Sequence, residues 1–404
     1  MKAYLDILKD VSENGHTAPS RPGIETKTMF HKTFRHDLRN GFPLLTTKKI
    51  NYRKVVGELF GFLTAADKVS DFHVFDCDIW DSWGLSNDYV DIKHVTNQHV
   101  AEKLAELRGI STEEAQQQVE KVISDYAQHA KDRINYEYKL TQELDDPYEI
   151  GDKMCEYDEK APITFKDFCH SIGIESLTYP VYQHHAGDLG PIYGKQWLEW
   201  KTSAGETINQ LKEVSNTLST NPRDRRMVVT AWNPEFKPSS LYIKNPLSDV
   251  AVTCSKDAID AAICDGKQAL PPCHVMFILM TYADKQTGTP ILNMHVIMRS
   301  TDVPIGLPYN IASYATLLEM IANAHDMIAG ELAIDMTDCH VYSDQLEMVE
   351  VQLARETKTL PTIKIPKGLL YDQPSTITKE RMDELVNSLD GYDPHPFIKY
   401  PVAV

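Results

Sequence analysis

The sequence predicts an α/β or α+β protein in which buried strands pack against helices. Three short apolar runs have the length and composition of buried strands: residues 227–232 (MVVTAW), 275–282 (VMFILMTY) and 291–298 (ILNMHVIM). Residues 310–329 (NIASYATLLEMIANAHDMIA) have instead the length and apolar spacing of a buried helix. With 404 residues, of which 42% are hydrophobic, the chain is long enough to bury such a core.

Residues 87–187 differ from the rest of the chain and are expected to form an acidic, mainly helical insertion. They hold 20 acidic and 10 basic side chains, so this quarter of the chain carries −10 of the net charge of −17. Ser111 and Glu114 form a capping box, and Ala115, Val119 and Val122 follow at helical spacing. We interpret the polar side as a solvated helix face, with a surface that binds a protein partner as the alternative.

Charge and cysteine pattern exclude several classes of protein. The net charge of −17 argues against broad nucleic-acid binding, which needs a dense cationic surface. No stretch approaches about 18 uninterrupted apolar residues, and the charged N-terminus lacks the apolar core of a signal peptide, so we expect a cytoplasmic protein without membrane association. The seven cysteines include no CxxC pair, which fits neither a disulfide framework nor a zinc ribbon.

Two motifs resemble known binding sites but lack their essential residues. GDLGPIYGKQ (187–196) does not have the spacing of a P-loop, and Gln196 stands where a magnesium-binding hydroxyl is needed. His184 and His185 are adjacent, so on an extended chain their side chains point in opposite directions, and no second ligand cluster accompanies them. We therefore expect no metal site.

The strongest chemical signal is Cys273 in the segment LPPCH. Two prolines restrict the backbone just before a predicted core strand, so the thiol can project into a pocket at the sheet edge; a structural cysteine is the alternative. Arginines stand near strand ends, at Arg225, Arg226 and Arg299, and Arg21 lies in RPGIETKTMF. Because arginine suits phosphate recognition and positive charge favours a thiolate, this combination points to a small phosphorylated ligand.

Ordered motifs along the chain resemble the thymidylate synthase family. They are RPGIETKTMF, GFPLLTTKK, ELFGFL, IWDSW, GDLGPIYGKQW, TNPRDRRMVVTAWNP, LPPCH, RSTDVPIGLPYNIASYA, CHVYSDQ and GYDPHPFIKYPVAV. They cover roughly residues 1–86, 187–236 and 269–404, about two thirds of the chain. The resemblance implies one domain over 1–404 built on a mixed, twisted β-sheet with packed helices, with insertions at 87–187 and 237–268. The second insertion holds one short helical piece, at 255–263.

The resemblance also implies a homodimer in which each site borrows two arginines, Arg225 and Arg226, from the other subunit. Cys273 is then the nucleophile that attacks dUMP. Residues of the phosphate and sugar sites are Arg21, Arg299, Ser300, His340 and Tyr342. Asn310 pairs with the O4/N3 edge of uracil, since cytosine presents the opposite donor–acceptor pattern and hydroxymethylases acting on it carry Asp there.

Other residues are assigned by the same resemblance to proton transfer and to the co-substrate 5,10-methylenetetrahydrofolate. Glu58 is the general acid/base, and Tyr193 is associated with removing the C5 proton. Asp302 contacts the substrates and reaches the pterin, Lys48 reaches the glutamyl tail, and Val404 closes over the folate. The remaining folate contacts are Ile79, Trp80, Ile305, Gly306 and Tyr309.

Two departures from the family pattern bear on the product. Met298 replaces the usual Gln before Arg299, as in bacteriophage hydroxymethylases, and Asp344-Gln345 replaces the usual Asn-His. Losing an amide beneath the base could rearrange the ordered waters. We therefore favour a phage-type dUMP hydroxymethylase of the host cytoplasm, which makes 5-hydroxymethyl-dUMP. Thymidylate synthase is the alternative, and a catalytically silent protein that binds a partner through the acidic insertion is a third.

Overall fold

A computed structural model describes residues 1–20, 23–94, 96–143, 147–174, 178–238, 243–244, 251–252 and 256–402. The chain divides into two compact units, one formed by Met1–Asp88 with His184–Val404 and the other by Tyr89–Gln183. Within the described residues, no helix has both the length and the apolar character needed to cross a membrane.

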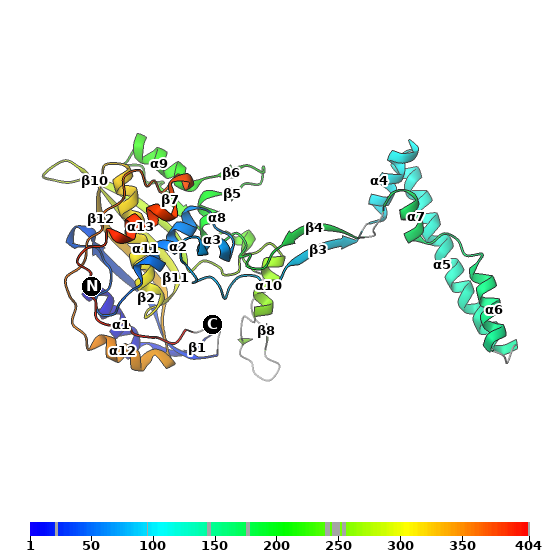
Figure 1. Ribbon diagram of the computed structural model, residues 1–404, viewed down its shortest axis with the longest axis horizontal. Helices are drawn as coiled ribbons and strands as arrows, with labels where there is room; N and C mark the ends of the chain where they lie inside the picture. The colour runs from blue at the N-terminus through cyan, green and yellow to red at the C-terminus, as the bar shows by residue number, and fades with distance from the viewer. Residues whose placement is uncertain are drawn as a thin grey trace. The chain divides into compact units, whose positions relative to one another are not determined.

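The first unit is built on a mixed six-stranded sheet (Figure 1). Its strands, in spatial order, are β1 (His16–Pro19), β2 (Glu25–Asp37), β12 (Ile328–Tyr342), β11 (Pro290–Asp302), β10 (His274–Ala283) and β7 (Val228–Thr230). β11 and β12 are parallel, and the other neighbours are antiparallel. The α/β prediction is thus confirmed, and the three predicted strands correspond to β7, β10 and β11.

Helix α11 (Gly306–Ala324) packs on β11 and β12 and connects these two parallel strands. Thirteen of its residues are buried, as the apolar sequence requires. The prediction that this helix extends to residue 329 was wrong. Asp326 adopts a φ of 51°, which is incompatible with an α-helix, and β12 already begins at Ile328. Around this layer lie α1 (Lys2–Asn14), α2 (Tyr52–Leu63), α3 (Val69–His73), α8 (Tyr193–Leu198), α9 (Gln210–Thr220), α12 (Leu346–Leu353) and α13 (Lys379–Asn387).

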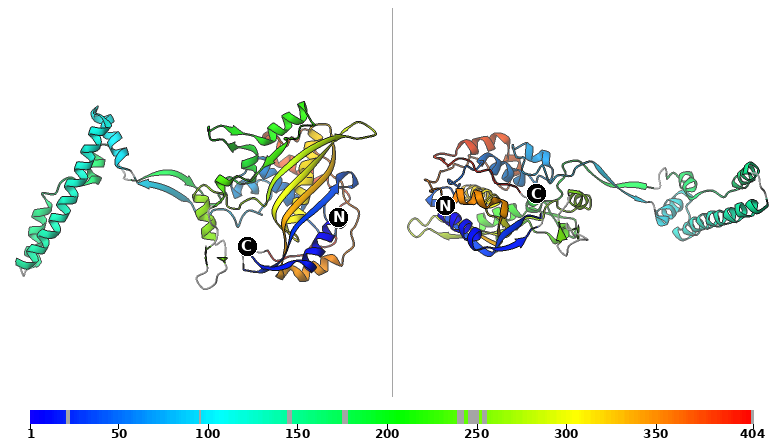
Figure 2. Two further views of the ribbon diagram at one scale, coloured as in Figure 1. Left: turned by 180° about the vertical axis from the view of Figure 1, so that it is seen from behind. Right: turned by 90° about the horizontal axis from the view of Figure 1, so that it is seen from below.

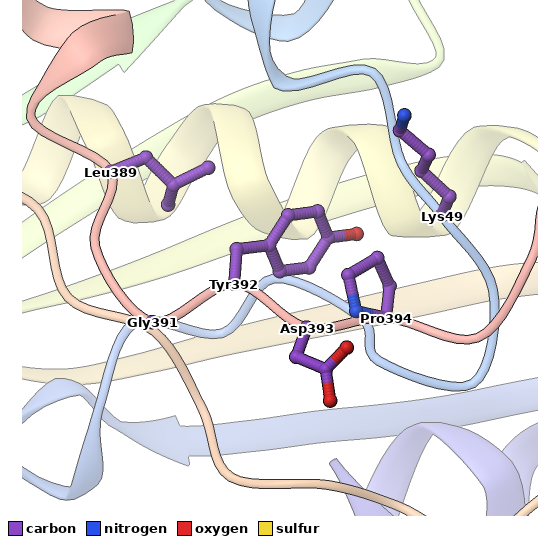
Figure 3. A pocket seen from close by; sticks show the side chains of 6 residues that line it. All are labelled: Lys49, Leu389, Gly391, Tyr392, Asp393 and Pro394. Carbon is purple, nitrogen blue, oxygen red and sulfur yellow. The ribbon is translucent and has the colours of Figure 1, made fainter.

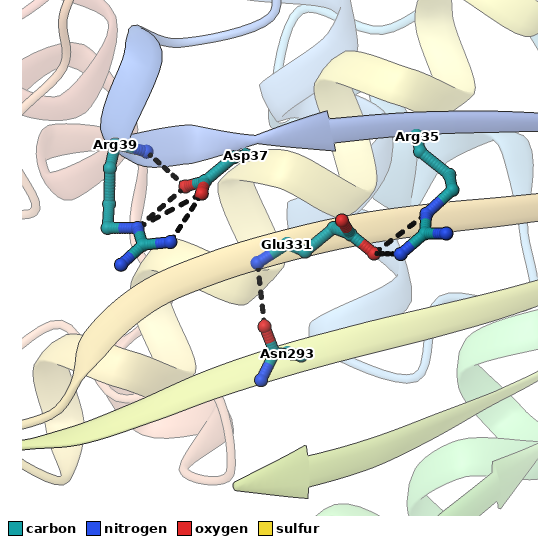
Figure 4. A network of polar contacts seen from close by, with 5 residues as sticks. All are labelled: Arg35, Asp37, Arg39, Asn293 and Glu331. Carbon is teal, nitrogen blue, oxygen red and sulfur yellow. Dashed lines mark hydrogen bonds and ion pairs between the residues drawn. The ribbon is translucent and has the colours of Figure 1, made fainter. Parts of the chain in front are cut away.

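The left view of Figure 2 shows the six-stranded sheet from behind. Its face opposite α11 carries exposed and polar side chains. Phe30 on β2 is 82% exposed and Met280 on β10 is 62% exposed. Polar pairs tie neighbouring strands together on the same sheet: the Arg35 guanidinium donates to Glu331 at 2.6 Å, and the Glu331 N–H donates to the Asn293 side chain at 2.8 Å (Figure 4). Phe30 and Met280 thus leave apolar side chains exposed on this face.

The second unit is mainly helical. It contains β3 (Tyr89–His94), which pairs with β4 (Thr178–His184), and the helices α4 (Asn97–Arg108), α5 (Thr112–Glu143), α6 (Pro147–Asp158) and α7 (Phe165–Ser171). The Ser111 hydroxyl accepts the Glu114 N–H at 3.1 Å and caps α5. A small core of its own includes Val100, Leu104, Val119 and Phe168. That this unit is an insertion into a single domain stays a prediction.

Short elements complete the first unit. β5 (Trp200–Lys201) pairs with β6 (Thr207–Ile208), and β8 (Ile243–Lys244) pairs with β9 (Ala251–Val252). Helix α10 (Lys256–Cys264) overlaps the helical piece predicted at 255–263. Much of the predicted second insertion, 239–242, 245–250 and 253–255, lies outside the described residues.

Candidate active site

A cavity of about 560 Å³ opens where β1, β2, β11 and β12 meet the segment before β10. Seven residues that the sequence nominated line it: Cys273, Arg299, Ser300, Asp302, Ile305, His340 and Tyr342. Segments far apart in the chain therefore place a thiol, a guanidinium, a carboxyl and an imidazole around one space. A cavity of this volume accommodates a small organic ligand.

A larger cavity of about 730 Å³ lies elsewhere and is lined by Lys49, Leu389, Gly391, Tyr392, Asp393 and Pro394 (Figure 3). None of the nominated residues lines it. The hydroxyl of its tyrosine is already hydrogen-bonded to the backbone: Tyr392 donates to the Leu45 carbonyl and accepts the Ile50 N–H, both at 2.8 Å. We therefore place the candidate active site in the smaller cavity.

Backbone and arginine contacts fix the position of Cys273. Its N–H donates to the Tyr193 hydroxyl at 2.8 Å, and its carbonyl accepts the Arg299 N–H at 2.9 Å. The Arg299 guanidinium donates to the carbonyls of Pro271 and Pro272 at 2.7 and 2.9 Å, which places Nη2 at 3.8 Å from the Cys273 sulfur. A positive charge is thus held against a sulfur that faces the cavity.

Neutral aromatic groups lie behind the cysteine. The Tyr193 ring stacks on His274 with 4.2 Å between ring centroids, and His274 Nδ1 lies 2.6 Å from the Tyr314 hydroxyl. Burial lowers the pKa of His274 to about 3 and raises the pKa of Tyr193 well above its usual value. Imidazole and phenol therefore both stay uncharged at neutral pH, and His274 does not serve as a cationic partner of the thiol.

Glu58, on α2, is a carboxyl adapted for proton transfer. The Trp80 indole N–H donates to its Oε1 at 3.1 Å. Burial raises the pKa of Glu58 to about 7, against the opposing effect of the Trp80 hydrogen bond. A carboxyl whose pKa lies near neutrality can both donate and accept a proton at working pH.

Asn310 lies over a thioether. Its Nδ2 is 3.9 Å from the Met298 sulfur, and the Thr301 hydroxyl is 3.7 Å from the same atom. Because a thioether is only a weak hydrogen-bond acceptor, this contact leaves the hydrogen-bonding capacity of the Asn310 amide available for a ligand.

The sequence did not nominate Asp338, although it joins three strands at the cavity. Its carboxylate accepts hydrogen bonds from the hydroxyls of Thr28 (2.5 Å) and Ser300 (3.0 Å) and lies 3.3 Å from His340 Nδ1. Burial alone would raise the pKa of Asp338, but the bonds from His340, Thr28 and Ser300 lower it to about 2. The carboxylate thus orients two nominated residues, and no pattern in the sequence distinguishes it from other polar strand residues.

Buried polar groups surround Asp302, which lines the cavity close to the C-terminal segment of the chain. Asp302 accepts the Ile305 N–H at 2.8 Å and the Gln345 amide at 3.4 Å, and burial raises its pKa. Lys48 is only 4% exposed and donates to the Pro304 carbonyl at 2.5 Å, so its ammonium is not presented at the surface. Burial lowers the pKa of Lys48 to about 8.

Other nominated residues are not part of the cavity lining. Arg225 and Arg226 line a separate hollow of about 290 Å³, where the largely exposed Arg226 pairs with Asp224 at 2.7 Å. Within one chain they are therefore not brought to Cys273. The cavity lining also does not include Glu58, Tyr193, Asn310, Ile79, Trp80, Gly306 or Tyr309. Arg21 and Val404 lie outside the described residues.

No group of three or more metal-ligating side chains is suitably placed within the part of the chain that the structure describes. His184 instead lies 3.4 Å from Asp188, whose carboxylate also accepts the His185 N–H at 2.9 Å.

Comparison with known proteins identifies the family. A sequence profile described as "Thymidylate synthase" matches residues 2–404. The thymidylate synthase of Listeria innocua serovar 6a (strain ATCC BAA-680 / CLIP 11262) is 31% identical over 404 residues, covering 100% of both chains. Those of Listeria monocytogenes serotype 4b (strain F2365) and serotype 4a (strain HCC23) are each 32% identical with the same coverage. The chain therefore belongs to the thymidylate synthase family.

Proposed function

We propose that this protein transfers a one-carbon unit to C5 of dUMP and acts as a thymidylate synthase, forming dTMP and dihydrofolate. The observation that carries the proposal is the Cys273 sulfur, which faces the cavity with the Arg299 guanidinium at 3.8 Å. Positive charge favours the thiolate, which is the nucleophilic form. The names of the relatives support the same activity.

Cys273 activates a carbon that is otherwise not nucleophilic. Its thiolate forms a bond to C6 of the pyrimidine, and the electron pair of the C5–C6 double bond moves into an enolate that includes C5 and O4. C5 then bonds to the methylene carbon of the co-substrate and loses its proton, and the bond between that carbon and the folate nitrogen breaks, which leaves an exocyclic methylene on C5. Addition of hydride to this methylene and departure of the Cys273 thiolate from C6 restore the ring double bond. The co-substrate 5,10-methylenetetrahydrofolate supplies the methylene and, in the synthase reaction, the hydride.

Glu58 and Tyr193 divide the proton transfers. With a pKa of about 7, Glu58 exchanges a proton with O4 through ordered water. Tyr193 stays a phenol and lies 2.8 Å from the Cys273 nitrogen, so it positions a water for the C5 proton rather than accepting that proton itself.

The polar lining suits a deoxynucleoside monophosphate. Nε and Nη2 of Arg299 donate to proline carbonyls. Nη1 can therefore donate to the phosphate, which we place next to the Ser300 hydroxyl. His340, oriented by Asp338, and Tyr342 offer hydrogen bonds to the deoxyribose. Asn310 supplies the donor and acceptor that the O4/N3 edge of uracil requires.

The apolar lining suits a flat heterocycle such as a pterin. Trp83, Leu270, Ile305 and Val402 border the same cavity as the Asp302 carboxyl. Asp302 and Ile305 are the nominated folate residues among them. The buried Lys48 is a poor ligand for a glutamyl tail in the arrangement described, so its assignment requires that the Pro304 contact opens.

Hydroxymethylation, which the sequence favoured, is the second candidate because Met298 lies directly against Asn310. In that reaction water adds to the exocyclic C5 methylene after tetrahydrofolate leaves, so the outcome depends on water access to the adduct. Two features restrict water access and therefore favour reduction of the C5 methylene by hydride. Trp80 is only 4% exposed and packs on Phe72, and the other departure, Gln345, is fully buried and holds the C-terminal chain in place.

The product distinguishes the two reactions. We expect that incubation with dUMP and 5,10-methylenetetrahydrofolate gives a nucleotide with the mass of dTMP and one dihydrofolate per turnover, which absorbance follows directly. A nucleotide with the mass of 5-hydroxymethyl-dUMP, released with tetrahydrofolate, would establish hydroxymethylation. Absence of both products would contradict the proposed function.

We further propose a homodimer that packs through the exposed sheet face and exchanges Arg225 and Arg226. Neither arginine reaches the Cys273 cavity within one chain, and Phe30 and Met280 leave apolar surface on that face.

Mixing two inactive variants tests the exchange. A dimer of one Cys273→Ser chain and one Arg225→Ala/Arg226→Ala chain contains one site with all native groups. Random reassortment should therefore restore up to about a quarter of native activity. The control is each variant mixed with itself. Mixed dimers that form but stay inactive would contradict the exchange.

A further inference from the structure

The C-terminal segment Ile398–Val402 is held against the rim of the cavity by one buried glutamine. Gln345, at the start of α12, is completely buried. Its Nε2 donates to the Pro401 carbonyl at 3.0 Å and to Asp302 Oδ2 at 3.4 Å, and its Oε1 accepts the Tyr342 N–H at 3.1 Å. Both hydrogens and the acceptor of the amide are thus in use.

These bonds join two parts of the cavity lining. Asp302 lines the cavity directly, and Pro401 precedes Val402, which also lines it. Proline has no N–H, so its carbonyl is the only backbone hydrogen-bonding group of that residue, and Gln345 occupies it. The second Asp302 oxygen accepts the Ile305 N–H at 2.8 Å, so both oxygens of the carboxyl are engaged.

Neighbouring anchors act on the segment at a different point. The Tyr400 hydroxyl lies 2.7 Å from Gln352 Oε1 and 3.1 Å from the Met348 carbonyl oxygen, which share its single proton, and the Lys48 ammonium lies 4.7 Å from the centroid of the Tyr400 ring. These contacts fix Tyr400 on α12 without touching Asp302. Gln345 hydrogen-bonds both to the segment, at Pro401, and to a carboxyl of the cavity lining, at Asp302.

We infer that Gln345 is a positioning residue that couples the C-terminal segment to Asp302 and so shapes the folate end of the cavity. The inference rests on the proposed function, because the folate end is assigned there. Glutamine makes more bonds here than histidine or glutamate: neutral histidine has one donor and one acceptor and cannot make all three bonds, and glutamate has no donor and would bring a second carboxyl against Asp302.

Two variants test this role. Gln345→Met keeps the size but removes the three bonds, and Gln345→Glu adds a competing carboxyl. We expect KM for methylenetetrahydrofolate to rise about 10-fold in Gln345→Met and more in Gln345→Glu, with KM for dUMP changed less than about twofold. In the ligand-free protein, amide exchange at Tyr400 and Val402 should accelerate in both variants.

Gln210 provides a matched control, because its amide also makes three hydrogen bonds, to Gln196 O (2.7 Å), Thr230 O (2.8 Å) and Thr230 N (2.9 Å), away from the C-terminal segment. Gln210→Met should lower thermal stability comparably and leave exchange at Tyr400 and Val402 unchanged. The role is overturned if the Gln345 variants do not accelerate that exchange, or if they raise both KM values equally. Since exchange needs no substrate, this result stands even if the wild-type protein shows no activity and the proposed function fails.

Discussion

Replacing Cys273 by serine is expected to reduce turnover of dUMP by about 10⁴-fold or more, because a hydroxyl is a far weaker nucleophile than a thiolate at neutral pH. The variant should also form no covalent complex with 5-fluoro-dUMP and methylenetetrahydrofolate. Fluorine replaces the proton that must leave C5, so the native protein stops at the adduct. Intact-protein mass spectrometry measures the adduct, and peptide mapping locates it.

Cys155→Ser is the control for this experiment. Cys155 is exposed in the second unit and lies outside the cavity lining, so its removal should preserve both turnover and the adduct. An adduct that persists in Cys273→Ser, or one that maps to another cysteine of the native chain, would refute the assignment of the nucleophile.

Replacing Glu58 by glutamine is expected to lower kcat by about 10²- to 10⁴-fold and to stabilise the fold at the same time. Below pH 4.5, the carboxyl is protonated in both folded and unfolded chains. Between pH 4.5 and about 7, the unfolded chain releases a proton that the folded chain keeps, so folding becomes progressively less favourable. Above that range the penalty is complete and on the order of 3 kcal/mol, which glutamine removes.

Denaturant unfolding at pH 4 and pH 8 checks this expectation, since the free energy of unfolding of Glu58→Gln should exceed that of the native protein only at the higher pH. Glu319→Gln is a matched control: burial raises the pKa of Glu319 to about 7 as well, but this residue on α11 is not among the candidate site residues. It should stabilise the protein at pH 8 and leave kcat unchanged. Full activity in Glu58→Gln would remove Glu58 from the proton transfers.

The elements that the sequence predicted were those with continuous apolar stretches, such as β10 and β11. Strands β2 and β12 were not predicted, although they are among the longest in the sheet. Their outward side chains are charged, as in the Arg35–Glu331 pair, so apolar runs do not mark them. Strand pairing across roughly 300 residues also leaves no local signal.

The candidate site follows the same division. Motifs nominated the thiol, arginine and imidazole of the cavity, since these residue types carry recognisable chemistry. Asp338 and Thr28 could be recognised as site residues only from the structure, in which the β2–β12 and β11–β12 pairings place them beside Ser300 and His340. The role of Gln345 depends on contact with Pro401, 56 residues away.

The cavity draws on both ends of the chain: β1 and β2 contribute from the first thirty residues, and Val402 contributes from the last few. The lining residues of these strands and Val402 are separated by more than 370 residues of sequence, so the cavity exists only in the folded unit. Unfolding of either contributing segment would therefore open the cavity to solvent, even where the thiol and the guanidinium keep their positions.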